Sequence, residues 1–172
     1  VRWLEFRRVL FRSISKMGSA STEEPNGLEI VVPVKGSDVD AFQDKAANLF
    51  AYFNVTPELV NASSSVNQII SSVKSKNALF SNDFYKFFGD GSSKVVMGGI
   101  AYHVDPNVFV DEISAEAKTI LEGGVVIYAG IGELEVSASR ETINYSAATK
   151  KKLASIINDI AKDLIQQGNN SF

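Results

Sequence analysis

Residues 132–146, GELEVSASRETINYS, decide the fold, since they join a strand-like run to the start of a helix. Leu134 to Val136 is expected to form a short strand, and the small polar residues that follow favour a loop. Ser146 is a suitable N-cap for a long final helix. Apolar residues then recur at helical spacing and predict one buried face, made of Leu153, Ile156, Ile157, Ile160, Ala161 and Leu164.

Strand-like and helix-like segments alternate upstream of this stretch. Gly124 to Ile127 predicts a strand of the buried type, and Ser114 to Leu121 predicts a short helix. Residues 94–104, KVVMGGIAYHV, predict a strand that is bent or closely packed at its two glycines. Residues 78–94 carry five aromatic residues and include a Gly-Asp-Gly turn.

The first third of the chain adds a strand and a helix. Leu28 to Val34 is rich in β-branched residues and predicts a strand, which Pro33 places at an edge or a strand end. Ser37 is expected to cap a helix with a core-facing stripe of Val39, Phe42, Ala46, Leu49, Phe50 and Phe53. Residues 61–77, rich in serine, are interpreted as an irregular insertion. The element order predicts an α/β (α+β) domain with helices packed on a sheet.

Composition excludes several classes of protein. The 172 residues suit one ordinary domain, or a small domain with a piece of another. No cysteine is present, which excludes disulfides and thiolate metal sites and makes an intracellular protein the natural interpretation. Residues 1–16 carry a net charge of +4, so the rest of the chain carries −7. An acidic body argues against a general nucleic-acid binder.

Residues 1–13, VRWLEFRRVLFRS, differ in composition from the rest. They hold four of the five arginines and the only tryptophan. The segment has the pattern of a transit peptide or a membrane-surface helix. We favour a non-native leader, because it resembles translated sequencing-adapter read-through and lacks a starting Met. On this interpretation the native N-terminal part of the protein is missing.

Three polar motifs are interpreted without a functional role. His103 has no second histidine or cysteine to share a metal, so no metal site is expected. Residues 150–152, KKK, fit a solvated helix face. Residues 89–94, GDGSSK, lack the spacing of a phosphate-binding loop and are expected to form a turn.

Arg140 stands out because residues 17–172 contain eleven lysines and this one arginine. A guanidinium is a planar, permanently charged fork that holds a carboxylate or phosphate in fixed geometry. In phosphoryl transfer such a group stabilises charge that develops on the terminal phosphate. The alternative is an architectural ion pair with Glu141, Glu135 or a nearby aspartate.

The run GELEVSASRETINYS resembles the strand-loop-helix of HtpG-type chaperones, where a Ser-Arg-Glu motif brings an arginine to the ATP γ-phosphate. Residues 23–35, EEPNGLEIVVPVK, resemble the last strand of a nucleotide-binding domain of the same GHKL superfamily (gyrase, HtpG-type chaperone, histidine kinase, MutL). Together with VVMGGIAYHVD between them, the two runs most resemble the rIIA-like proteins of tailed phages.

This resemblance implies a domain order and a set of site residues. Residues 14–36 would end a GHKL-type ATPase domain. Residues 37–172 would form a transducer-like, ribosomal-protein-like mixed sheet with packed helices. Arg140 would sense the γ-phosphate, beside Asn144 in place of a longer glutamine. Gly27 would match a turn beside the nucleotide, and Ser139 would cap a helix that opens at Arg140.

Departures from the family pattern limit what the chain does alone. The sequence lacks three motifs of the family: the helix with a catalytic Glu and a metal-binding Asn, the Asp-x-Gly-x-Gly loop, and the Gly-rich lid. ATP with Mg is therefore expected only in an intact parent chain, and this chain alone is expected to be inactive. The resemblance implies the cytoplasm of an infected host cell, and leaves a homodimer and peripheral membrane association open. The alternative is a non-enzymatic phage or host-interaction module with an α/β fold.

Overall fold

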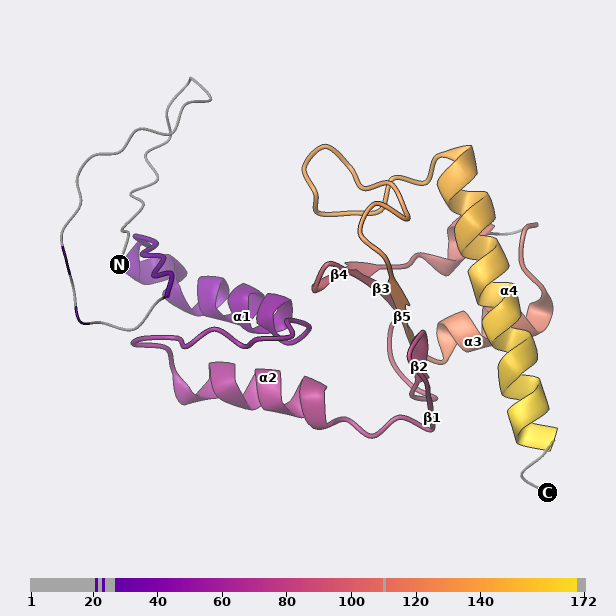
Figure 1. The fold of residues 1–172 in the computed structure, drawn as a ribbon, viewed down its shortest axis with the longest axis horizontal. Coiled ribbons are helices and arrows are strands. Elements are labelled where there is room, and N and C mark those ends of the chain that lie inside the picture. The colour runs from indigo at the N-terminus through magenta and orange to yellow at the C-terminus, as the bar shows by residue number, and fades with distance from the viewer. Residues whose placement is uncertain (1–20, 22, 24–26, 110, 170–172) are drawn as a thin grey trace. The chain divides into compact units, whose positions relative to one another are not determined.

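The computed structural model describes residues 21, 23, 27–109 and 111–169 (Figure 1). The chain divides into two compact units, Val1–Asp38 and Val39–Phe172, and each is described by itself. Residues 1–13, interpreted above as a non-native leader, lie outside the described residues.

In the first unit, residues 27–35 have no regular secondary structure, and a short 3-10 helix, η1 (Gly36–Asp38), follows them. The predicted strand at Leu28 to Val34 is therefore wrong. Leu28, Ile30 and Val31 are 69%, 74% and 79% exposed. A strand needs a neighbouring strand to pair its amides and carbonyls, and the described residues of this unit supply none.

The second unit is a mixed α/β domain built on a five-stranded sheet. Its strands are β1 (Phe80–Ser81), β2 (Tyr85–Phe87), β3 (Lys94–Met97), β4 (Ile100–His103) and β5 (Val125–Ala129). They lie in the order β1-β2-β5-β3-β4, and only β3 and β5 are parallel. The helices are α1 (Val39–Phe50), α2 (Ser64–Ser75), α3 (Ala115–Glu122) and α4 (Ala147–Asn169), with a 3-10 helix, η2 (Pro106–Phe109).

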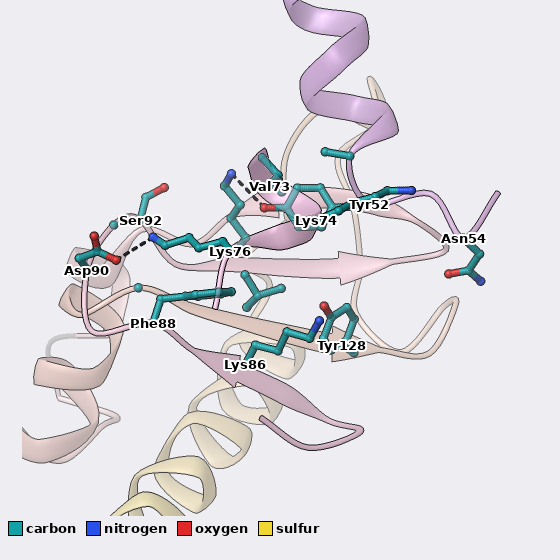
Figure 2. Close-up of a pocket in the computed structure, with 15 residues that line it drawn as sticks. Tyr52, Asn54, Val73, Lys74, Lys76, Lys86, Phe88, Asp90, Ser92 and Tyr128 are labelled. Carbon is teal, nitrogen blue, oxygen red and sulfur yellow. Dashed lines mark hydrogen bonds and ion pairs between the residues drawn. The ribbon is translucent and has the colours of Figure 1, made fainter. Parts of the chain in front are cut away.

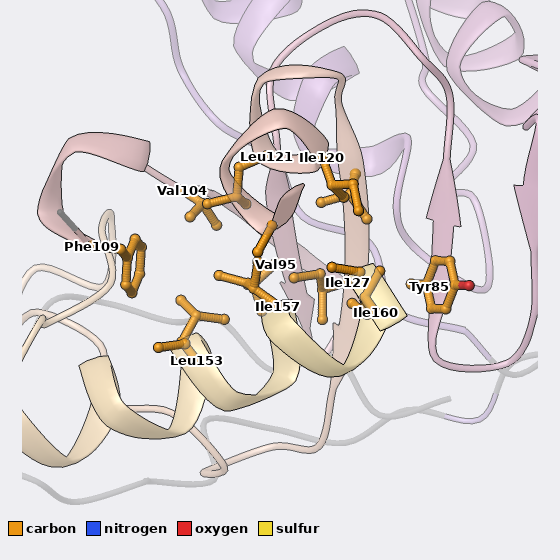
Figure 3. Packing of buried hydrophobic residues seen from close by; sticks show 14 of the residues in the cluster. Tyr85, Val95, Val104, Phe109, Ile120, Leu121, Ile127, Leu153, Ile157 and Ile160 are labelled. Carbon is orange, nitrogen blue, oxygen red and sulfur yellow. The ribbon is translucent and has the colours of Figure 1, made fainter. Parts of the chain in front are cut away.

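The main core lies between the sheet and helices α3 and α4. In Figure 3, Leu153, Ile157 and Ile160 of α4 face Val95 and Ile127 of the two central strands. The predicted α4 face is buried except for Ile156, which is partly buried. Each of these apolar side chains contributes about 1.5–3 kcal/mol on burial. Burying this stripe is therefore what fixes α4 on the sheet.

A smaller core holds α1 against α2. Ala47, Val66 and Ile70 are buried there, with Phe50 and Ile69 packed around them. The helix predicted from residue 39 is confirmed, but its aromatic stripe is only partly buried, with Phe42 44% and Leu49 39% exposed. Ser37 is not a simple N-cap, since it lies inside η1 and its hydroxyl donates to the Asp38 carboxylate at 2.9 Å.

Helix α2 corrects the prediction of an irregular insertion at residues 61–77. Between its serines, apolar residues recur at the helical spacing i, i+3, i+4 and i+7, namely Val66, Ile69, Ile70 and Val73. Two of these residues are fully buried against α1. Tertiary packing therefore overrides a weak local preference.

Residues 94–104 form a hairpin instead of one bent strand. Gly98 and Gly99 have φ values of +60° and +81°. Positive φ at both central residues is the geometry of a type I′ turn, which reverses the chain directly. Strands β3 and β4 then pair antiparallel, with Met97 opposite Ile100.

Three remaining predictions concern the C-terminal third. Helix α3, capped by Ser114, and strand β5 are confirmed. Leu134 to Val136 is not a strand, since only an isolated bridge joins Val136 to Ile143. No helix opens at Arg140, because α4 begins at Ala147, where Ser146 accepts from the Thr149 amide at 3.3 Å.

Ser93 is a buried polar residue whose hydrogen bonds should stabilise the folded chain. Its hydroxyl donates to the Leu121 carbonyl at 2.6 Å and accepts from the Val125 amide at 2.9 Å, so it joins α3 to β5. Ser93→Ala leaves both backbone groups unpaired and should lower the free energy of unfolding by about 2 kcal/mol. Chemical denaturation measures this, with the exposed neighbour variant Ser92→Ala as the control. Equal stability of the two variants would contradict the assignment.

Candidate functional site

The connection between β5 and α4 carries the predicted site residues. It is held at its base by Leu134 and Ile143, both buried in the main core. Two backbone hydrogen bonds flank the Val136–Ile143 bridge, from Ser137 N to Thr142 O at 2.8 Å and from Asn144 N to Glu135 O at 2.9 Å. Residues 138–142 therefore form an exposed loop on a fixed base.

Arg140 lies in this loop in a left-handed backbone conformation, with φ of +60°. Its amide donates to the Ser137 carbonyl at 2.8 Å and closes a turn. The Ser137 hydroxyl accepts from the Thr142 amide at 3.3 Å and lies 3.0 Å from the Ser139 hydroxyl. Positive φ is uncommon for a residue with a side chain and costs about 1 kcal/mol or more. The turn therefore fixes the backbone at Arg140, while its side chain is exposed.

The guanidinium of Arg140 is exposed and makes no hydrogen bond or ion pair within the described part of the chain. Its expected acidic partners are engaged elsewhere or lie too far away. Glu135 accepts from the Asn144 side chain at 3.2 Å. Glu141 is not within ion-pair distance of any described cation. The architectural ion pair of the alternative interpretation is thus not formed among these residues.

Glu133, the other acid of this connection, is also occupied. Its carboxylate accepts from Lys152 at 2.9 Å and from the Gly130 amide at 2.8 Å. The hydrogen bond from Lys152 lowers the pKa of Glu133, with a smaller contribution from Gly130. This pairing closes the turn after β5, so Glu133 acts as an anchor for the loop base.

The other two predicted nucleotide-binding residues, Asn144 and Gly27, lie outside the exposed loop that carries Arg140. Asn144 is exposed and its side chain bonds Glu135, so it helps to close the loop base. Gly27 belongs to the first unit and is exposed, and a Cβ added there would meet no atom within 4 Å. Among the described residues, no hydrogen bond joins the Asn144 side chain to Arg140.

A second candidate site, which sequence reasoning missed, is a cavity of about 400 Å³ that we call the lysine pocket (Figure 2). Its wall includes Lys74, Lys76, Lys86, Lys94, Asp90 and Tyr128. These residues come from α2, β2, β3, β5 and the connecting loops. Four of the lining residues, Asp90, Gly91, Ser92 and Lys94, belong to the run GDGSSK, which was interpreted above as a turn without a phosphate-binding role. Only the sheet order brings Lys94 beside Lys86.

Metal-binding groups are scarce. Within the described ranges, no three His, Asp or Glu side chains are arranged to hold a metal ion. His103 is exposed at the end of β4. In the same part of the chain, no helix is both long and apolar enough to cross a bilayer.

Comparisons with family models, with curated proteins and with solved structures find no match for this chain.

Proposed function

We propose that this chain is the transducer-like part of a GHKL-type ATPase related to the rIIA-like phage proteins. Arg140 would contact the γ-phosphate of ATP that a preceding nucleotide-binding domain holds with magnesium. The ATPase would act in the cytoplasm of the infected host cell. Residues 27–35 would complete the sheet of that preceding domain.

The observation that carries the proposal is an exposed guanidinium without an acidic partner on a strained, anchored turn. Arginine is suited to this task, because its fork can hold two phosphate oxygens at once. A fixed donor contributes most when charge develops in the transition state, since it needs no reorganisation at that moment. A preceding domain that supplies the phosphate would also explain why Arg140 has no acidic side-chain partner among the described residues.

The exposed apolar residues of the first unit support the same arrangement. Leu28, Ile30 and Val31 have the composition of a strand but no partner strand among the described residues. A neighbouring sheet would satisfy their backbone groups and cover their side chains. The same exposure also favours the alternative, an interaction module that docks a partner by adding a strand.

The coding sequence upstream of Ile14 tests the proposal directly. We expect it to encode a helix with a Glu-x-x-x-Asn pattern and an Asp-x-Gly-x-Gly loop, which supply the catalytic base, the metal ligand and the adenine contact. Sequencing that region from the source DNA reads out both motifs. If neither motif is present, the ATPase proposal is wrong and the interaction module becomes the better explanation.

A further inference from the structure

The lysine pocket lies on the sheet face opposite the main core. Lys86 and Lys94 each pair with Val126 across β5, so these three residues share one face. Tyr85, Val95 and Ile127 pair in the same way and point into the core on the other face. Alternation along the strands therefore presents two lysines on the face that α4 leaves uncovered.

The pocket concentrates positive charge in an acidic chain. Four lysines and one carboxylate, Asp90, line it, a net charge of +3 where the whole chain carries −3. Asp90 bonds Lys76 at 2.7 Å, but its side chain is 76% exposed, so this ion pair is weak. The remaining positive charge is not neutralised by any carboxylate in the described residues.

Neutral oxygens and aromatic rings contact the ammonium groups of three of the four lysines. Lys94 donates to the Tyr52 hydroxyl at 3.2 Å, and Lys74 donates to the Phe53 carbonyl and the Thr56 hydroxyl. Lys76 lies over the Phe88 ring, 4.9 Å from its centre. Lys86 makes no hydrogen bond or ion pair with the described residues, although it is half-buried. Lys74, Lys76 and Lys94 are therefore preorganised, and Lys86 has no partner among the described residues that would compete with a ligand.

Uncharged donors complete the wall. The backbone amides of Asp90, Gly91 and Ser92 make no hydrogen bond within the described ranges, and Gly91 has a φ of +102°. Successive free amides in a turn favour anions. Tyr128 adds a phenol, and burial, with a contribution from the neighbouring Tyr52, raises the pKa of Tyr128. Its hydroxyl is protonated at neutral pH and able to donate.

We propose that the lysine pocket binds a small molecule that carries a diphosphate group. Two linked phosphates carry about three negative charges at neutral pH, which matches the net charge of the wall. Lysine is a common phosphate ligand, and the cavity volume lies in the range of small-molecule sites. The residues involved do not include Arg140, Asn144 or Gly27, so this proposal is independent of the ATPase proposal.

Inorganic pyrophosphate is the probe for this site, added to the isotope-labelled 172-residue chain and followed by amide NMR. We expect saturable shifts at Lys86, Gly91, Ser92 and Tyr128, with a sub-millimolar dissociation constant. Lys86→Gln should raise that constant about tenfold, because it removes a charge-assisted hydrogen bond. Lys118→Gln removes an equal charge from the exposed face of α3 and should change it less than about twofold.

Three results would overturn the proposal. They are shifts spread evenly over all lysine-bearing surfaces, the absence of saturation, and equal weakening by Lys86→Gln and Lys118→Gln. A melting curve reports whether Lys86→Gln is folded. If it is not, the pattern of shifts in the unsubstituted chain decides between specific binding and diffuse attraction.

Discussion

If the chain belongs to the ATPase proposed above, Arg140→Lys in the intact protein should lower the turnover number about a hundredfold while the affinity for ATP changes little. The substitution keeps the positive charge but removes the planar fork. If the fork meets charge that develops only in the transition state, its loss reduces kcat and not ground-state binding. Losing one such donor typically costs about 3 kcal/mol, which corresponds to the hundredfold change.

The same position should tolerate substitution in the folded chain. Arg140 is exposed and has no side-chain partner among the described residues, so Arg140→Ala should change the free energy of unfolding by less than about 0.5 kcal/mol. Steady-state hydrolysis and a melting curve on the same variants separate the two effects. Lys151→Gln, an exposed charge on α4, serves as the control for turnover.

The opposite pattern would identify an architectural arginine. If Arg140→Ala unfolds the domain and Arg140→Lys retains full turnover, Arg140 holds the fold through a contact outside the described residues. The ATPase proposal would then lose the observation that carries it. If Arg140→Lys weakens ATP binding but leaves the turnover number unchanged, Arg140 binds the substrate and the transition state equally well.

Local sequence patterns predicted those helices and strands whose buried face is visible in the spacing of their own apolar residues. The apolar face of α4 and its Ser146 cap could be predicted directly, because periodicity and capping are local properties. Helix α2 was not predicted, because its many serines make the segment look polar. Its few apolar residues form a buried face only by packing against α1. The Leu28 to Val34 segment was mispredicted for the converse reason, because β-branched residues indicate a strand only where a partner strand exists.

The two candidate sites differ in the same way. Arg140 could be singled out from the sequence because it is a rare residue type in a recognisable motif. Its left-handed backbone and its lack of an acidic partner could not, since the first depends on the turn closed by Ser137 and the second on the bond between Glu135 and Asn144. The lysine pocket could not be predicted from the sequence, because its residues come together only in the folded chain. Lys74 and Lys94 are twenty positions apart, and only the placement of α2 over the sheet brings them to one cavity.

Gly124 lies between α3 and β5, at a position where the neighbouring backbone leaves no space for a Cβ atom. Its φ is +75°, and a Cβ at this position would overlap the carbonyl oxygen of Asp90 and lie 2.8 Å from its carbonyl carbon. The Gly124 carbonyl also accepts from the Phe88 amide at 3.1 Å. The loop that contains Asp90 is therefore held directly against Gly124 and cannot move away without losing this bond.

Gly124→Ala should consequently lower the free energy of unfolding by about 4 kcal/mol and the melting temperature by about 10 °C. The left-handed backbone alone accounts for about 1 kcal/mol, and the backbone overlap accounts for the rest. Gly132→Ala separates the two terms, because Gly132 has a similar φ of +79° but no atom near its Cβ position. It should cost only about 1 kcal/mol, measured by the same thermal and chemical denaturation. Equal costs at the two glycines would mean that the loop yields, and that backbone conformation alone sets the requirement for glycine.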